Sequence, residues 1–223
     1  MRKILTLLVA IATLGAGNLS WAKDDAYPGD IAVIELGHKG DVTALQRLRK
    51  TYLPRATKKE RFAIFVASRI ASPSEFTNEF VANLPAKRGD VWFDLTGYEH
   101  AWTYSEFFVA DQLREIAATG HKEAISKLIE MGTWVGGGWA MIIHSGIVRC
   151  LIRHPDATLT ELAKRSEGER SRLLETTFAL SLLDEDVEPL LLSVRQATVT
   201  SSNIRSQIER LVSAEMSGRK KKP

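Results

Sequence analysis

The sequence predicts an all-α protein, arranged either as a right-handed stack of helical hairpins or as an irregular helical bundle. Three observations support this fold class: signals for helix starts recur along the chain, apolar residues recur at every third or fourth position, and no segment sustains the period-2 alternation of a strand. Short helices joined by short loops must pack on their neighbours in sequence, which both arrangements allow. With 44% hydrophobic and 26% charged residues, the chain is globular in composition, so collagen-like and wholly disordered classes are excluded.

The chain opens with the three-part layout of a secretory signal peptide. A basic start at residues 1–3 precedes an uncharged apolar run over residues 4–17, and Ser20 and Ala22 place small residues before a cut after Ala22. The apolar run is shorter than the roughly 20 residues that a membrane-spanning helix needs, so we expect no stable transmembrane anchor. We expect residues 1–22 to be removed on export to a bacterial periplasm, with an uncleaved anchor as the alternative.

Helix starts are marked at five places in the remaining chain. The Ser/Thr-x-x-Glu pattern of a capping box occurs at residues 57–60, 72–75 and 158–161, and Asp41 and Ser202 are candidate N-caps of two further helices. Helix ends are expected near four glycines and two prolines, which are Gly37, Gly120, Gly132, Gly218, Pro85 and Pro155. Together these signals predict roughly nine helices of about 8–18 residues within a single domain over residues 23–218.

Two of these helices are expected in the middle of the chain, over residues 121–131 and 139–153. The second is apolar apart from His144, Ser145 and Arg149, which is typical of a central core helix.

A tripeptide that occurs twice in the chain favours the stack of hairpins over the irregular bundle. Gly-His-Lys occurs at residues 37–39 and again at residues 120–122, each time before an expected helix, so the spacing of 83 corresponds to two hairpins of about 40 residues. The segment from Gly40 to Leu48 resembles the opening of the second helix in HEAT-type repeats. This resemblance implies a binding scaffold without catalytic machinery of its own.

The charge of the chain is concentrated at its two ends. Lys and Arg number 30 against 27 Asp and Glu, but two of the basic residues lie in the leader and four lie at residues 219–222. The rest of the chain carries 24 basic and 27 acidic residues, so it has no excess of positive charge for binding nucleic acid. We expect residues 219–223 to form a basic disordered tail.

The most unusual segment places three consecutive glycines between two tryptophans. Trp134 and Trp139 flank Gly136, Gly137 and Gly138, and such a run of glycine predicts a turn rather than a helix interior. These five residues are candidates for partner binding, because tryptophan is a common anchor at interfaces. The alternative is a connector whose glycines allow close backbone approach while both indoles pack into the core.

A second candidate surface is aromatic. Seven of the 17 aromatic residues lie between residues 92 and 108. Tyr98 and Trp102 are four residues apart, as are Tyr104 and Phe108, so each pair shares a face of an expected helix over residues 98–118. Because both faces cannot point inward, Tyr98, Trp102 and Tyr104 are candidate partner-binding residues, and core packing is the alternative.

The remaining residues give no catalytic constellation. His144 and Ser145 are adjacent, which directs their side chains apart on a helix, and Ser145 lacks the Gly-x-Ser-x-Gly elbow. Cys150, the single cysteine, lies in an apolar helix and is expected to be a buried hydrophobic residue. No His-Glu-x-x-His motif occurs, so we expect no metal and no cofactor.

The sequence thus predicts an exported, periplasmic module that binds another envelope protein as an inhibitor, immunity factor, adaptor or assembly factor. One alternative is a hydrolase acting on cell-wall or lipid material with Asp94, Glu99, His100 and Glu106. Another is a module that binds a glycan or peptidoglycan through the aromatic residues near Trp92.

Overall fold

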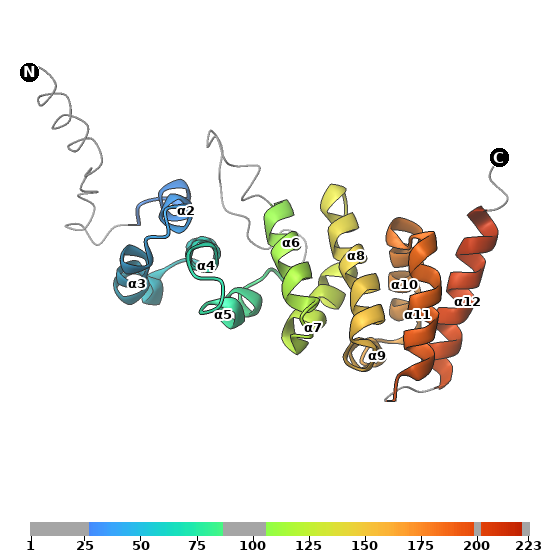
Figure 1. The fold of residues 1–223 in the computed structure, drawn as a ribbon. Coiled ribbons are helices and arrows are strands. Elements are labelled where there is room, and N and C mark those ends of the chain that lie inside the picture. Colours follow the sequence, from blue (N-terminus) through green and yellow to red (C-terminus); the bar gives the residue numbers. More distant parts are fainter. Residues whose placement is uncertain (1–26, 87–105, 199–201, 220–223) are drawn as a thin grey trace, which may run out of the picture.

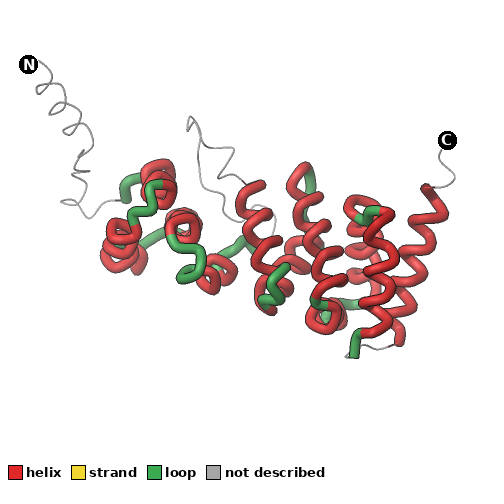
Figure 2. The backbone as a smooth tube through the Cα atoms, viewed as in Figure 1, coloured by secondary structure: helices red, strands yellow, loops and turns green. Residues whose placement is uncertain are grey.

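The protein is all-helical over the residues that its computed structural model describes, which are 27–86, 106–198 and 202–219 (Figures 1 and 2). The helices are α2 (Asp30–His38), α3 (Val42–Thr51), α4 (Lys58–Ala71), α5 (Thr77–Ala82), α6 (Glu106–Ala117), α7 (Lys122–Gly132), α8 (Gly138–Arg153), α9 (Pro155–Ala163), α10 (Glu167–Ser181), α11 (Asp184–Gln196) and α12 (Ser202–Arg219). A 3-10 turn, Leu53–Arg55, follows α3. The predicted fold class is confirmed.

The helices form a row in which each packs mainly on its near neighbours (Figure 1). On one side, α2 packs against α4, α6 against α8, α8 against α10, and α10 against α12. On the other side, α5 contacts α7 and α7 contacts α9. Over α2–α9 this alternation of sides is the arrangement of stacked helical hairpins, whereas α11 packs on α8 and α12. One continuous hydrophobic core joins them from Val33 to Val212.

Helix α8 is the centre of the row. It packs against α6, α7, α9, α10 and α11, more partners than any other described helix has among the main contacts. Its buried residues include Ile143, Ile147 and Leu151, which follow each other at every fourth position. The expected core helix over residues 139–153 is therefore confirmed, with its start one residue earlier.

Two of the predicted N-caps hold. The Thr57 hydroxyl accepts from the amide of Glu60 at 3.3 Å, and the Glu60 carboxylate accepts from the amide of Thr57 at 2.7 Å, which completes a capping box on α4. The Asp41 carboxylate accepts from the amide of Ala44 at 2.9 Å and caps α3.

The other two predicted capping boxes are wrong. The amide of Ser72 donates to the carbonyl of Ser68 at the end of α4, so it is not available to Glu75, and α5 starts later. Thr158 lies inside α9, because Pro155 at the first helical position starts that helix three residues earlier. The sequence analysis missed a capping box at Ser166, which starts α10.

Three of the predicted helix ends also shift. Gly37 lies inside α2, and the left-handed residue of that turn is Gly40, with φ of 67°. Gly120, with φ of 89°, occupies the predicted turn before α7. Gly132 and Gly218 are helical residues, the first ending α7 and the second lying near the end of α12.

The internal repeat that the sequence suggested is present in the fold, but its spacing is different. Helices α3 and α7 begin at Val42 and Lys122, which are 80 residues apart. Helices α4 and α8 begin at Lys58 and Gly138, which are also 80 residues apart. The turn glycines Gly40 and Gly120 share this offset, whereas the Gly-His-Lys tripeptides are 83 residues apart and do not align.

The buried residues confirm the offset of 80. Between the hairpins α2–α3 and α6–α7, the buried apolar pairs at this spacing are Val33 and Leu113, Leu36 and Ile116, Leu45 and Ile125, and Leu48 and Leu128. The first three helices of the α2–α5 segment thus pack in the same pairs as those of the α6–α9 segment, whereas α9 packs on α7 and α5 has no corresponding main contact with α3. The segment from Gly40 to Leu48 opens α3, the second helix of the first hairpin.

Candidate functional site

Five of the eight predicted partner-binding residues are described by the structure. Tyr98, Trp102 and Tyr104 lie outside the described residues, as do Asp94, Glu99 and His100 of the hydrolase alternative. Trp134, Gly136, Gly137, Gly138 and Trp139 are described and lie at the junction of α7 and α8.

The two tryptophans of this junction contact each other. Their ring centroids are 5.8 Å apart with an interplanar angle of 69°, an edge-to-face geometry. Both side chains are half-buried and pack against the hydrophobic core. The indole nitrogen of Trp134 is buried and has no acceptor among the described residues. The pair therefore contributes both to the core and to the surface.

The glycines of the junction divide into two roles. Gly136 and Gly137 form the predicted turn, are exposed, and have open space where a Cβ would lie. Gly137 has φ of 72°, which favours glycine. Gly138 is instead the first residue of α8, so the prediction of a turn over all three glycines is wrong at this residue.

A groove lies between α6, α8 and α11 in the C-terminal half of the described chain. Its volume is about 520 Å³. The apolar lining comprises Val148 and Ile152 of α8 with Leu183 and Pro189 of the opposite wall, and the polar lining comprises Arg114, Ser145, Arg149, Arg153, Ser181 and Asp186. We refer to these residues as the α8–α11 groove.

The stripe that α8 presents to this groove continues into exposed apolar residues. Met141, Ser145, Arg149 and Arg153 follow at every fourth position, which places them along one side of the helix. The side chain of Met141 is 57% exposed and that of Leu183 is 55% exposed. The Ser181 hydroxyl donates to the carbonyl of Met141 at 3.3 Å, which holds the ends of α8 and α10 together beside the groove.

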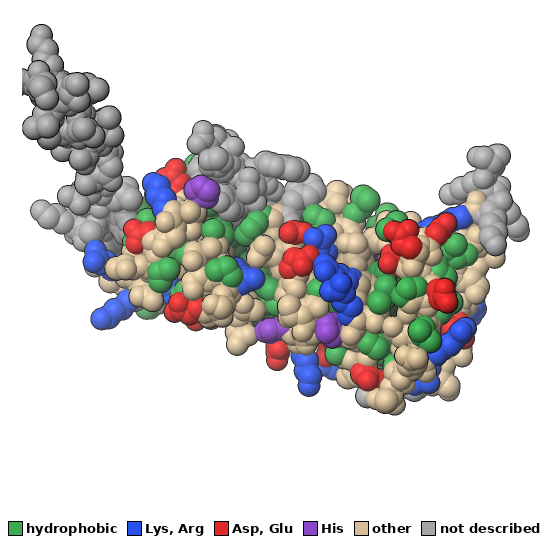
Figure 3. Space-filling view, in the orientation of Figure 1, with side chains coloured by type: hydrophobic (Ala, Val, Ile, Leu, Met, Phe, Trp, Pro, Cys, Tyr) green, Lys and Arg blue, Asp and Glu red, His purple; other side chains and the backbone are tan. Residues whose placement is uncertain are grey.

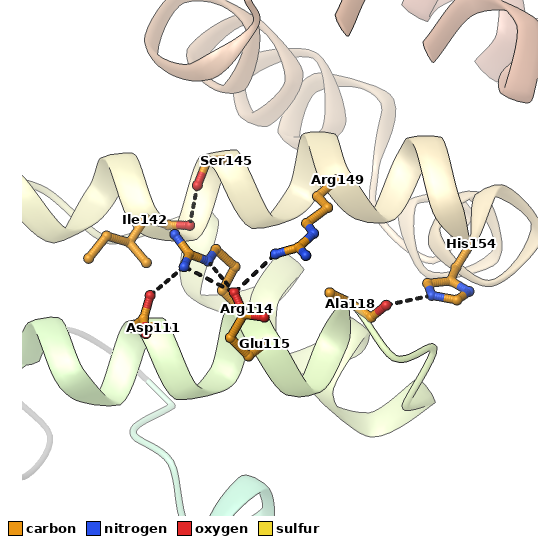
Figure 4. A network of polar contacts seen from close by, with 8 residues as sticks. All are labelled: Asp111, Arg114, Glu115, Ala118, Ile142, Ser145, Arg149 and His154. Atoms are coloured by element: carbon orange, nitrogen blue, oxygen red, sulfur yellow. Dashed lines mark hydrogen bonds and ion pairs between the residues drawn. The ribbon is translucent and has the colours of Figure 1, made fainter. Parts of the chain in front are cut away.

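Three arginines give the groove its charge, and a run of basic side chains is visible in the middle of the molecule (Figure 3). Arg114 of α6 and Arg149 of α8 both reach the carboxylate of Glu115, each at 3.0 Å (Figure 4). Arg114 also pairs with Asp111 at 2.5 Å. Partial burial alone would raise the pKa of Glu115, but the hydrogen bonds and charges of Arg114 and Arg149 lower it below its usual value.

Arg153 differs from the other two arginines. It is exposed, and it has no carboxylate within ion-pair distance in the described part of the chain. Asp186, the acidic residue of the lining, accepts a hydrogen bond from the amide of Leu183 at 3.3 Å and so caps α11. The groove therefore holds more guanidinium groups than carboxylates that pair with them.

Two buried groups are structural. His144 is fully buried, its Nδ1 lies 2.9 Å from the hydroxyl of Thr177, and burial lowers its pKa to about 4, so the ring is neutral. Burial raises the pKa of the Cys150 thiol to about 12, opposed in part by the charge of Arg149, which confirms that this cysteine is a buried hydrophobic residue.

Ser145 does not form a nucleophile–base pair with its neighbour. Its hydroxyl donates to the carbonyl of Ile142 at 2.9 Å. Within residues 27–86, 106–198 and 202–219, no three His, Cys, Asp or Glu side chains come together as metal ligands. No helix in this described part combines the length and hydropathy needed to cross a bilayer.

The sequence analysis did not find the α8–α11 groove. One signal was present, because Met141, Ser145, Arg149 and Arg153 have helical spacing within an otherwise apolar segment. The walls from α6 and α11 are distant in sequence, and no pattern within one helix identifies them. Comparisons with protein family models, characterised proteins and solved structures give no match for this chain.

Proposed function

We propose that this chain is an exported helical scaffold that binds another protein of the bacterial envelope through the α8–α11 groove. The observation that carries the proposal is the groove itself, in which exposed apolar side chains adjoin three arginines. Interfaces between proteins combine an apolar centre with arginine in this way. The signal-peptide layout of residues 1–22 supports export.

The repetitive architecture supports binding rather than turnover. A row of stacked hairpins offers an extended surface whose parts are fixed relative to one another by a continuous core. His144 and Cys150, two titratable groups inside the described core, are neutral at pH 7 and packed, so they support a structural role. The hydrolase and glycan-binding alternatives depend on residues outside the described part of the chain and stay predictions.

Site-specific photo-crosslinking in the producing cell tests this proposal. We would place a benzophenone amino acid at Leu183, in the groove, and separately at Leu192, which is exposed to a similar extent, 53%, but does not line the groove. Adducts of defined mass in the periplasmic fraction are expected from position 183 and not from position 192.

Two outcomes would contradict the proposal. One is the absence of any adduct from position 183 when the protein is present in the periplasmic fraction. The other is the same set of adducts from both positions, which would indicate collisions rather than a binding surface.

A further inference from the structure

Two arginines in the wall of the α8–α11 groove are about one helical turn apart on α8. Arg149 and Arg153 are four residues apart on α8, so their side chains are neighbours on its surface. Arg114 adds a third guanidinium from α6, and Glu115 is the carboxylate that Arg114 and Arg149 share. Arg153 has no such partner in the described chain, and it carries the unbalanced charge of this wall.

An apolar strip runs beside these arginines. Val148 and Ile152 are also four residues apart on α8, and Leu183 faces the same groove from the start of α11. Burying the exposed leucine against a partner's apolar side chain would remove apolar surface from water and so favour binding. The groove is thus suited to a ligand that presents acidic and apolar groups side by side.

We propose that the occupant of the α8–α11 groove is an acidic amphipathic segment of a protein partner, which places carboxylates on Arg149 and Arg153 and an apolar side chain between Ile152 and Leu183. This inference rests on the proposed function and adds the chemistry of the partner. Arginine suits this role, because its planar fork binds carboxylates with two parallel hydrogen bonds.

The opposite wall argues against an extended polyanion such as a lipid surface or a nucleic acid. The first turn of α11 carries Asp184, Glu185 and Asp186, and Asp186 itself lines the groove. A continuous anionic surface laid over the arginines would also meet these carboxylates and be repelled by them. A short segment can place its acidic groups on α8 alone, so a peptide fits the charge distribution better.

Fluorescence anisotropy on the full chain tests the inference. The probe is a fluorescein-labelled twelve-residue peptide with glutamates at positions i and i+4 and a leucine at position i+3. The control is the same peptide with glutamine in place of both glutamates. Saturable binding of the glutamate peptide is expected, at least tenfold tighter than that of the glutamine peptide and weaker at high salt.

Two variants with the same charge change give the matched comparison. Arg153→Glu should weaken binding at least tenfold, because it replaces a positive charge that binds a glutamate of the peptide with a negative one. The change should not disturb the fold, because Arg153 forms no ion pair in the described chain. Arg47→Glu, on the exposed surface of α3, should leave binding unchanged. Circular dichroism melting curves confirm that both variants fold.

The inference is overturned if both peptides bind equally, or if Arg153→Glu binds as well as Arg47→Glu. It is also overturned if phosphatidylglycerol vesicles, rather than the glutamate peptide, bind the protein in an Arg153-dependent manner. Should the peptide fail while position 183 still gives specific adducts in cells, the proposed function stands and the acidic segment is wrong.

Discussion

At the scale of single residues, His144 shows how a buried polar side chain is accommodated. The Thr177 hydroxyl donates to the carbonyl of Leu173 at 2.7 Å, so it accepts from His144, which places the ring proton on Nδ1. The Nε2 atom has no partner among the described residues. Protonation there would bury an uncompensated charge, which is why the native state keeps the ring neutral.

We predict that His144 makes the protein less stable in mild acid. Its pKa is about 4 in the folded protein and about 6.5 in the unfolded chain, so the unfolded state takes up the proton first as the pH falls. The free energy of unfolding should therefore be fully maintained above pH 6.5 and decline from there towards pH 4, by on the order of 3 kcal/mol.

Urea unfolding between pH 7.5 and pH 4 measures this decline. His144→Leu should flatten it, because leucine cannot be protonated and the Thr177 hydroxyl keeps its acceptor at Leu173. An unchanged decline in His144→Leu would show that other groups cause it.

At the scale of secondary-structure elements, the sequence identified helices more reliably than their ends. The expected helices over residues 121–131 and 139–153 each match the structure to within one residue. A Ser/Thr-x-x-Glu pattern is compatible with several backbone states, and the structure uses it at Thr57 and Ser166 but not at Ser72 or Thr158. What decides between them is whether the amide of the Ser or Thr already has a partner, which depends on where the preceding helix stops.

We predict different stability effects for two serines that share this pattern. Ser166→Ala should lower the free energy of unfolding by about 1 kcal/mol, because it removes the cap of α10 and the hydrogen bond of the Ser166 hydroxyl to Glu169. Ser72→Ala should cost less than about 0.5 kcal/mol, because its hydroxyl bonds to Glu75 only on the exposed surface. Equal effects in chemical denaturation would refute the assignment of the caps.

At the scale of the whole molecule, the spacing between hairpins depends on small residues at points of backbone contact. A Cβ at Gly37 would lie 2.6 Å from the carbonyl oxygen of Ala67 and 2.9 Å from its Cα, so α2 and α4 approach there as closely as their backbones allow. Because both atoms belong to the main chain, no side-chain rotation relieves the clash.

We therefore predict that Gly37→Ala lowers the free energy of unfolding by roughly 2 kcal/mol, despite the higher helix propensity of alanine. Gly168→Ala, in α10, is the matched control, because nothing lies within 4 Å of its added methyl group. That variant should be neutral or more stable by up to about 1 kcal/mol. If Gly37→Ala did not lower the free energy of unfolding, α2 would be able to move away from α4 without loss of stability.

The whole-molecule arrangement also explains what the sequence could not predict. Helical periodicity and short loops are local properties, so the fold class followed from them. The α8–α11 groove depends on Arg114 and Leu183 meeting around Arg149, and these residues are brought together only by the packing of three helices. The offset of 80 residues was hidden because buried positions such as Leu36 and Ile116 keep their size and polarity but not their identity.

The end of α12 offers a place from which to observe the groove. Arg219, which the sequence analysis assigned to a tail, is the last residue of α12, and it donates to the carbonyl of Leu182 at 2.7 Å and pairs with Asp184 at 3.0 Å. These two residues flank Leu183. Because Cys150 is the sole thiol and is buried with a raised pKa, a cysteine in place of the exposed Gly218 would be selectively alkylated. An environment-sensitive dye attached there, next to the contacts of Arg219 with Leu182 and Asp184, would show whether occupancy of the groove changes the end of α12, without alteration of any lining residue.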